Sequence, residues 1–379
     1  MNHGDARRQT PDASERRPFL ASGVWRLVST TLLLLPLLTF TNRSEARPAP
    51  KKKAPPFPTR ARSPWDVEAR EYLGTPASEL AVARALKYLA STQNPDGAWI
   101  SSSYTSEAGI VGLCAMAFLS AGHQPGRGPY GRLLTRATDY LLASCQRNGL
   151  IYNTSGSAGP PMYGHGFATL ALAELYGQTG RRGVRDRLER AVKLILTTQN
   201  EEGGWRYQPR VADADISVSV CQVMALRAAH NAGVPVPRET IDRALEYMKR
   251  CANNFDGGFS YMPSQRGSGT ARTGAGVLSL IVMGQRNVEE VKRGLEYLLA
   301  HPPGTREQHL FYGLYYGTQA MYQAGGAHWR FWFPRVADFL VASQRPDGSW
   351  YDGPGLPYAT ALGVLTLQVP ANLLPIYQK

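Results

Sequence analysis

Cysteine is scarce in this chain of 379 residues, and its spacing excludes the common metal-binding motifs. The chain has four cysteines, with no CxxC pair and no Cys/His cluster at metal-ligand spacing. We therefore expect no metal and no other cofactor. The four lie at different heights of different predicted helices, and a disulfide needs Cα atoms within about 7 Å. The prediction is four unpaired, mostly buried thiols at Cys114, Cys145, Cys221 and Cys251.

The apolar run near the N-terminus is too short for a typical membrane span. Residues 27–41 form a stretch of fifteen residues interrupted by Pro36, whereas a transmembrane helix needs about 20. Arg16-Arg17-Pro18-Phe19-Leu20 before it resembles the twin-arginine export motif, and Ser44-Glu45-Ala46 after it is typical of a cleavage site. We predict that residues 1–46 are an export signal peptide and that the chain is periplasmic or in the cell envelope. An uncleaved anchor at 27–41 and a general secretory signal remain open.

Acidic residues are missing from the segment that follows. Residues 47–63 form a Pro-rich, basic linker without Asp or Glu. The whole chain has 42 Lys and Arg against 29 Asp and Glu, but its first 63 residues contain 12 basic and only 4 acidic residues. The positive charge therefore belongs mostly to the N-terminal segment, which argues against a nucleic-acid partner and permits at most peripheral attraction to a membrane surface.

What the chain does contain is a repeat. The frame Arg84–Trp99, RALKYLASTQNPDGAW, returns at Arg190–Trp205 and at Arg335–Trp350. Weaker copies begin at Arg136, Arg243 and Arg293, so that six leading arginines follow one another at intervals of 42 to 54 residues. Self-similarity at such a period indicates a repeat architecture.

Each repeat reads as a helical hairpin. The first half is an amphipathic helix that ends at a turn such as Asn94-Pro95-Asp96-Gly97. The second half is a helix that is apolar nearly all round, which predicts burial on every side. These inner helices are expected at residues 109–122, 164–176, 216–233, 274–283, 308–325 and 357–367. Six outer and six inner helices with a dry inner ring favour a closed all-α barrel over residues 64–379, because an open solenoid would need polar end caps.

The combination of Arg-Ala, aromatic-aliphatic, Gln and Gly-x-Trp is similar to the QW repeat of squalene and oxidosqualene cyclases, which protein prenyltransferase β subunits share in looser form. The resemblance covers residues 78–368 and implies an (α/α)6 toroid with a central cavity. It does not by itself imply an activity. We interpret Gln and Trp of the repeat as clamps between repeats, outside any active site.

In such a toroid the loops before the inner helices open onto the cavity. The polar residues expected there are Glu107, His165, Asp213, Asp215, Arg272, His309 and Tyr358, and the added aromatic surface is expected from Tyr104, Tyr163, Tyr312, Tyr315 and Tyr316. Any one of them could be a helix cap, but equivalent positions around a ring predict a polar-aromatic pocket. The substrate-binding candidates are Glu107, Tyr163, His165, Arg272, His309, Tyr312 and Tyr358.

Asp213-Ala214-Asp215-Ile216-Ser217 resembles the DxDD motif with which squalene-hopene cyclases protonate an alkene. The resemblance implies that Asp215 is the catalytic acid and that nearby Asp213 assists, since two close carboxylates raise one pKa. Ile216 replaces the last Asp of the motif, and a single toroid replaces the two domains of triterpene cyclases. Both departures argue against cyclisation of a full triterpene.

Other activities of similar toroids are disfavoured. Protein prenyltransferases hold zinc through Asp, Cys and His, but residues 256–276 contain no Cys and His309 has no thiolate partner. The Gly-Cys-Gly-Glu-Gln thioester motif of complement-type toroids is also absent.

Three functions remain open. The first is a terpene cyclase or mutase-like enzyme that acts on an isoprenoid through Asp215. The second is a toroid that binds a lipid or another hydrophobic small molecule without catalysis. The third is a scaffold of the cell envelope that docks another protein through its rim. The sequence leaves enzyme status undecided.

Overall fold

The structure is a computed structural model that describes residues 73–101, 107–153, 160–302, 304 and 309–378. The predicted signal peptide and linker lie outside these residues, as do Tyr104 and the side chain of Glu107. The described part contains twelve α-helices and no β-strand. None of the described helices is both long and apolar enough to cross a membrane.

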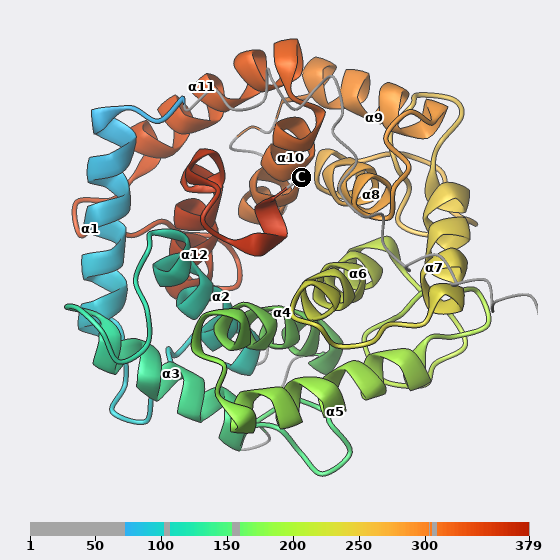
Figure 1. Ribbon diagram of the computed structural model, residues 1–379. Helices are drawn as coiled ribbons and strands as arrows, with labels where there is room; N and C mark the ends of the chain where they lie inside the picture. The colour runs from blue at the N-terminus through green and yellow to red at the C-terminus, as the bar shows by residue number, and fades with distance from the viewer. Residues whose placement is uncertain (1–72, 102–106, 154–159, 303, 305–308, 379) are drawn as a thin grey trace, which may run out of the picture. The chain divides into compact units, whose positions relative to one another are not determined.

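The helices alternate between two layers (Figure 1). The outer helices are α1 (Pro76–Thr92), α3 (Gly131–Ala143), α5 (Arg182–Thr198), α7 (Arg238–Cys251), α9 (Glu289–Ala300) and α11 (Gly326–Ser343). The inner helices are α2 (Glu107–Ser120), α4 (Pro161–Thr179), α6 (Ile216–Asn231), α8 (Thr270–Val282), α10 (Leu310–Ala324) and α12 (Leu356–Leu367). The predicted all-α fold of six hairpins is confirmed.

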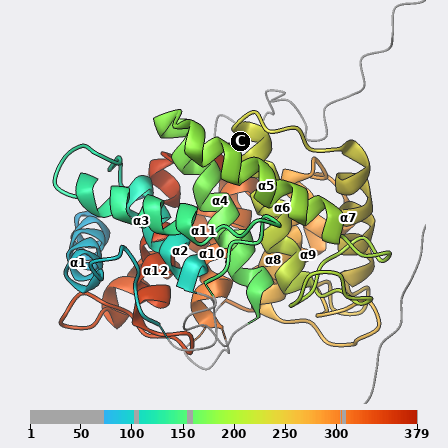
Figure 2. The same ribbon diagram turned by 90° about the horizontal axis from the view of Figure 1, so that it is seen from below.

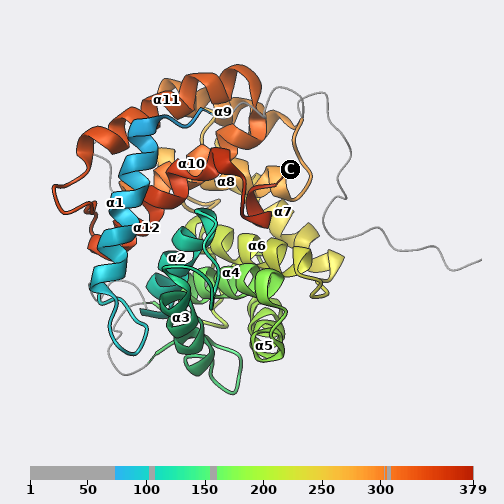
Figure 3. The ribbon, with the colours of Figure 1, turned by 60° about the vertical axis from the view of Figure 1, so that its left-hand side comes forward.

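The inner helices form a closed ring. Neighbouring inner helices contact one another in chain order, and α12 returns to contact α2. Outside them, α1 packs against α11 and α12, so the first repeat meets the last (Figure 3). Figure 2 shows the same ring from its side. The burial agrees with the layers, since nearly every side chain of α4 and α10 is buried whereas α5 and α7 bury one face.

The repeat residues Trp and Gln join elements at equivalent places. The indole nitrogens of Trp99, Trp205 and Trp350 donate to carbonyls of their own outer helices at 2.7–2.8 Å, and all three rings are buried. The Gln199 amide donates to the carbonyl of Thr240 in the next outer helix at 2.9 Å, and that of Gln344 donates to Ala81 of α1 at 2.8 Å. The interpretation as a clamp between repeats is thus confirmed for Gln, and the Gln344 clamp closes the ring, whereas the hydrogen bond of each Trp stays within its own repeat.

Glycine at the clamp turn is required by close packing. Gly348 has φ +89°, and a Cβ there would lie 2.6 Å from the carbonyl oxygen of Arg84. The Arg84 guanidinium in turn donates to the carbonyl oxygens of Arg345 and Pro346 at 3.2 and 3.0 Å. The leading Arg and the Gly of the repeat are therefore two sides of one joint between neighbouring repeats.

The C-terminal residues cross the end of the ring at which the inner helices finish. After α12 the chain makes short 3-10 turns at Val369–Ala371 and Pro375–Tyr377, and the C-terminus lies over the middle of the ring in Figure 1. The Glu174 carboxylate in α4 accepts a hydrogen bond from the backbone N–H of Ile376 at 3.1 Å. The Gln323 amide in α10 donates to the carbonyl of Tyr377 at 3.0 Å. This end of the ring is filled by chain.

All four cysteines are unpaired. Cys114, Cys221 and Cys251 are buried, while Cys145 is partly exposed. The prediction of free, mostly buried thiols is confirmed, because each cysteine lies on a different helix or loop without a second cysteine beside it.

Candidate functional site

A cavity of about 520 Å³ lies at the end of the ring where the inner helices begin. Six of its thirteen lining residues are Tyr or Phe, and the lining also includes one arginine and one histidine. The lining residues are Tyr163, Phe167, Tyr207, Ser217, Tyr261, Gly269, Thr270, Ala271, Arg272, His309, Tyr312, Pro354 and Tyr358.

The first turns of the inner helices supply most of this lining. Tyr163, Tyr312 and Tyr358 are each the third residue of α4, α10 and α12. Because the hairpins share one register, the same position in three different helices places a tyrosine at the cavity. Tyr312 donates its hydroxyl to the Ser217 carbonyl in α6 at 2.8 Å, which ties two lining helices together.

The structure brings together five of the seven predicted substrate-binding residues. Tyr163, Arg272, His309, Tyr312 and Tyr358 all line the cavity. Tyr163 and Arg272 were expected just before helices but lie inside α4 and α8, whereas Tyr312 and Tyr358 lie inside helices as expected. His309, expected inside a helix, is the N-cap of α10. Helices α4 and α12 begin earlier than predicted. Pro161 and Pro357 lie in their first turns, where a backbone N–H would have no partner within the helix, so proline is well tolerated there.

His165 is placed away from the cavity, which corrects its predicted role. Its side chain is fully buried, and Nδ1 accepts a hydrogen bond from the backbone N–H of Ile151 at 3.1 Å. Ser219 accepts from the N–H of Trp205 and Thr273 from that of Phe259, and in all three pairs the acceptor follows its donor by 14 residues. Burial lowers the pKa of His165 to about 4, so the ring is neutral. His165 therefore accepts a structural hydrogen bond in the second repeat, as Ser219 and Thr273 do in later repeats.

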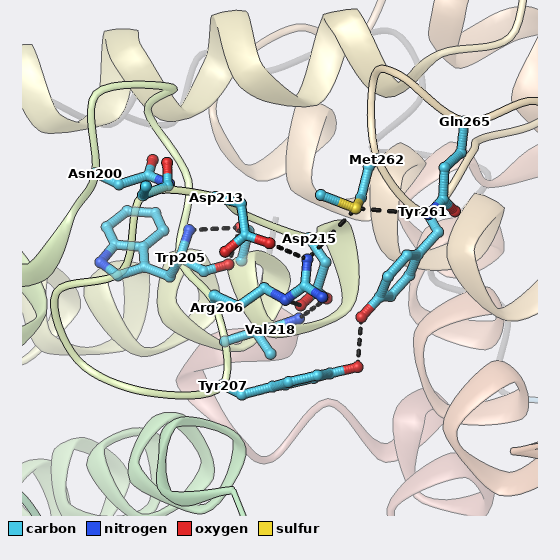
Figure 4. Close-up of polar contacts among 12 residues, drawn as sticks. Asn200, Trp205, Arg206, Tyr207, Asp213, Asp215, Val218, Tyr261, Met262 and Gln265 are labelled. Atoms are coloured by element: carbon cyan, nitrogen blue, oxygen red, sulfur yellow. Dashed lines mark hydrogen bonds and ion pairs between the residues drawn. The ribbon is translucent and has the colours of Figure 1, made fainter.

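Asp215 is buried beside the cavity and does not line it. It is the N-cap of α6, and its Oδ1 accepts from the backbone N–H of Val218 at 2.9 Å. Its Oδ2 accepts no hydrogen bond and lies 3.7 Å from Nε of Arg206 (Figure 4). Burial raises the pKa of Asp215 to about 6, against the lowering effects of the Val218 N–H and the Arg206 charge.

Asp213 differs from its neighbour. Its side chain is half-exposed and forms an ion pair with Nη1 of Arg206 at 2.8 Å. Both carboxylates thus face one guanidinium, which lies between them in Figure 4. The sequence suggested that two neighbouring carboxylates would raise the pKa of Asp215. In the structure, burial is the largest cause of its raised pKa.

Three residues of the site escaped sequence reasoning. The guanidinium carbon of Arg206 lies 4.9 Å from the ring centre of Tyr207 and 5.6 Å from that of Tyr261. The two tyrosine hydroxyls are hydrogen-bonded to each other (Figure 4). Burial, with Asp215 among the further causes, raises the pKa of Tyr261. The hydroxyl of Tyr261 therefore stays protonated and the side chain stays neutral. Tyr207 follows Trp205 by two residues, and Tyr261 follows Phe259 by two residues. This shared position in the repeat is the sequence signal by which both tyrosines could have been found.

The described residues contain no group of three or more His, Cys, Asp or Glu side chains placed to hold a metal ion. The site brings together one buried carboxylic acid, one paired guanidinium and a set of tyrosines. A carboxyl near its pKa can give a proton, and tyrosine faces attract a cation.

Comparison with known proteins agrees with this architecture. Residues 168–337 match the squalene-hopene cyclase C-terminal domain. A drimenyl diphosphate synthase from Streptomyces showdoensis is 29% identical over 189 residues, which are 49% of this chain and 33% of that protein. The match thus spans about one third of the curated relative's length.

Solved structures show the same fold. The type II terpene cyclase MstE from Scytonema, without ligand, superimposes with a TM-score of 0.56 at 15% identity, covering 79% of this chain and 100% of that one. Cellobiose 2-epimerase from Bacillus thermoamylovorans superimposes with a TM-score of 0.59 at 13% identity, covering 77% and 98%. Because a sugar epimerase shares the fold, the fold alone does not select the ligand.

These findings confirm the resemblance predicted from the repeats. The chain is an α/α toroid with the fold of the type II terpene cyclases, and its residues 168–337 are similar to the squalene-hopene cyclase C-terminal domain.

Proposed function

We propose that this toroid binds an isoprenoid-like hydrophobic ligand in the tyrosine cavity and that Asp215 is an acid for its cyclisation or isomerisation. The observation that carries the proposal is the cavity itself, where five tyrosines and Phe167 line a space of about 520 Å³. Apolar bodies with a few placed polar groups are typical of small-molecule sites. The names of the similar proteins support it, since the Streptomyces enzyme is a drimenyl diphosphate synthase and MstE has been solved with geranylgeranyl dihydroxybenzoate.

Asp215 has two properties that an acid catalyst needs. Its burial favours the protonated form, and it lies close to the lining, since the N–H of the next residue, Ile216, donates to the carbonyl of the lining residue Tyr261 at 3.0 Å. In the proposed step the O–H bond of Asp215 breaks while a C–H bond forms on an alkene carbon. The cation that results is stabilised by tyrosine faces, and the carboxylate left behind is stabilised by Arg206 and the Val218 N–H.

Asp215→Asn is expected to abolish turnover without unfolding the protein. Asparagine caps a helix about as well as aspartate, so α6 keeps its N-cap, but it has no proton to give. In the wild type, turnover should rise as pH falls toward about 6 and below, because the raised pKa of Asp215 then leaves more of the acid protonated. Mass spectrometry of products from farnesyl and geranylgeranyl compounds measures this.

The matched control is Asp242→Asn, which removes an exposed carboxylate paired with Arg238 on α7. It should leave turnover unchanged. Turnover retained by Asp215→Asn would refute the catalytic role, and a wild type that binds isoprenoids but converts none would leave only the binding function.

We also propose that the chain is exported to the periplasm or cell envelope. The support is the sequence alone, namely Arg16-Arg17 with the apolar residues 27–41 and the cleavage site at Ala46. N-terminal sequencing of the protein from cells that make the full chain is expected to find Arg47 first. An intact residue 1 would favour the membrane anchor, and a cytoplasmic mature chain would contradict export.

A further inference from the structure

The cavity lining is positively charged. Among the described lining residues Arg272 is a fixed cation and no residue is an Asp or Glu. The neighbouring Arg206 is matched by Asp213 and Asp215, whereas no carboxylate of the described residues pairs with Arg272. A guanidinium in a partly enclosed site is stabilised by an anion. Because the described lining has no carboxylate for Arg272, we expect the ligand to carry the negative charge.

Local packing places Arg272 at the cavity. It is the third residue of α8, and its guanidinium lies over Gly269. A Cβ at position 269 would be only 2.8 Å from Nη2 of Arg272. Glycine there leaves room for the guanidinium to lie across the first turn of the helix, where it forms part of the lining.

The backbone adds to the same field. Helices α4, α8, α10 and α12 all begin at the lining, and none of them has a side-chain hydrogen bond at its N-cap. Each helix N-terminus carries a partial positive charge of roughly +0.5. Carboxylates are found at two N-termini of this end of the ring: Asp215 caps α6, and Oδ2 of Asp352 accepts from the Phe311 N–H in the first turn of α10 at 3.1 Å, which leaves α4, α8 and α12 without a capping side chain.

The tyrosines do not cancel this charge. Burial raises the pKa of Tyr163 and of Tyr312 well above the usual range, so both stay neutral. Their hydroxyls can donate hydrogen bonds and their rings offer apolar surface. The lining therefore combines a cationic edge at α8 with an aromatic body formed by Phe167, Tyr312 and Tyr358.

We propose that the ligand of this cavity is an isoprenoid with an anionic head group, a phosphate or a carboxylate, which Arg272 binds while the chain lies against Phe167, Tyr312 and Tyr358. This inference rests on the proposed function and adds the charge of the head group and the residue that recognises it. A neutral hydrocarbon or alcohol of the same length would leave the Arg272 charge unmatched.

Three probes with one C15 chain test the proposal: farnesyl monophosphate, farnesoic acid and farnesol. Dissociation constants are measured by equilibrium dialysis with the protein from residue 47 onward, in both low and high salt. We expect at least one anionic probe to bind tenfold or more tighter than farnesol at low salt, with the difference shrinking at high salt. Preference for the phosphate alone, the carboxylate alone or both identifies the head group.

Arg272→Gln is expected to remove that preference and leave the affinity for farnesol unchanged. The control is Arg266→Gln, which removes an exposed arginine of the loop before α8 that does not line the cavity. Its preference should equal that of the wild type. Circular dichroism melting of each variant verifies that folding is intact.

The outcomes separate this inference from the proposed function. Equal binding of farnesol and both anions, or a preference that survives Arg272→Gln, overturns the inference and leaves isoprenoid binding in place. Equal loss in Arg266→Gln would also overturn it, since surface charge would then explain the preference. If none of the probes and none of their C20 homologues binds, the proposed function itself is refuted.

Discussion

Trp205→Ala is expected to lower the free energy of unfolding by about 3–5 kcal/mol, the usual cost of deleting a buried tryptophan. The ring is 1% exposed, and its Nε1 donates to the Ile195 carbonyl at 2.8 Å. The substitution leaves both a cavity and a buried carbonyl without its donor. Since proteins of this kind are stable by only about 5–15 kcal/mol, the loss is a large share of the total.

Chemical denaturation followed by circular dichroism measures this change. The control is Tyr351→Ala, which removes an aromatic ring that is 67% exposed directly after the clamp Trp350. The expected effect of Tyr351→Ala is small, because little packing is lost.

Below its own melting temperature, Trp205→Ala should still bind ligand, since Trp205 does not line the cavity. An unchanged melting temperature would show that Trp205 does not act as a clamp.

Glu174→Gln is expected to stabilise the protein at alkaline pH. The Glu174 side chain is buried, its Oε1 accepts from the Ile376 N–H, and its Oε2 has no partner in the described structure. Burial raises the pKa of Glu174 from 4.5 to about 8. The titratable groups that face it are Tyr315 of α10 and Tyr377 of the C-terminal turn, and neither supplies a positive charge.

The sign follows from proton binding. Between about pH 4.5 and 8 the unfolded chain has lost the Glu174 proton while the folded chain still holds it, so stability falls as pH rises through this window. A shift of this size corresponds to about 4–5 kcal/mol, at 1.36 kcal/mol per unit. Glutamine keeps the acceptor for Ile376 and does not ionise, so the variant loses this pH dependence.

Unfolding free energies at pH 5, 7 and 9 test the prediction. The variant should be close to the wild type at pH 5 and several kcal/mol more stable at pH 9. Glu246→Gln, which removes an exposed carboxylate of α7, is the control and should not show this difference. A difference between wild type and Glu174→Gln that is the same at all three pH values would contradict the buried, protonated state of Glu174.

Much of the fold could be predicted from the sequence because each repeat encodes its structure locally. Helical spacing of apolar residues, a turn with Gly97 and the following Trp99 define one hairpin, and six copies define the ring. Ile216 was predicted as the first residue of an inner helix and is the first residue of α6, since Asp215 is a good N-cap. Helices α4 and α8, which begin at Pro161 and Thr270, start earlier than expected. In their first turns the Met162 N–H donates to the Tyr207 carbonyl, and the Thr270 hydroxyl donates to the His301 carbonyl.

The site was predicted less completely. Tyr163, Arg272, His309, Tyr312 and Tyr358 lie on the lining because equivalent positions in a closed ring converge on one end of it. His165 has the same local appearance, but it packs under Ile151 as a backbone acceptor. Local sequence does not distinguish the two, since two residues along a helix turn the side chain by about 200°, from the cavity to the next layer.

The sequence by itself determined the repeat, the two helical layers, the ring and the clamps, because these depend on short-range periodicity and on residues repeated in one register. Only the tertiary structure decided which side chains meet. Arg206, Tyr207 and Tyr261 come from two different repeats, and their stacking and the shared ion pair with Asp213 and Asp215 exist only after α6 and α8 pack side by side. The pKa of Asp215 likewise depends on burial, which is a property of the closed ring as a whole.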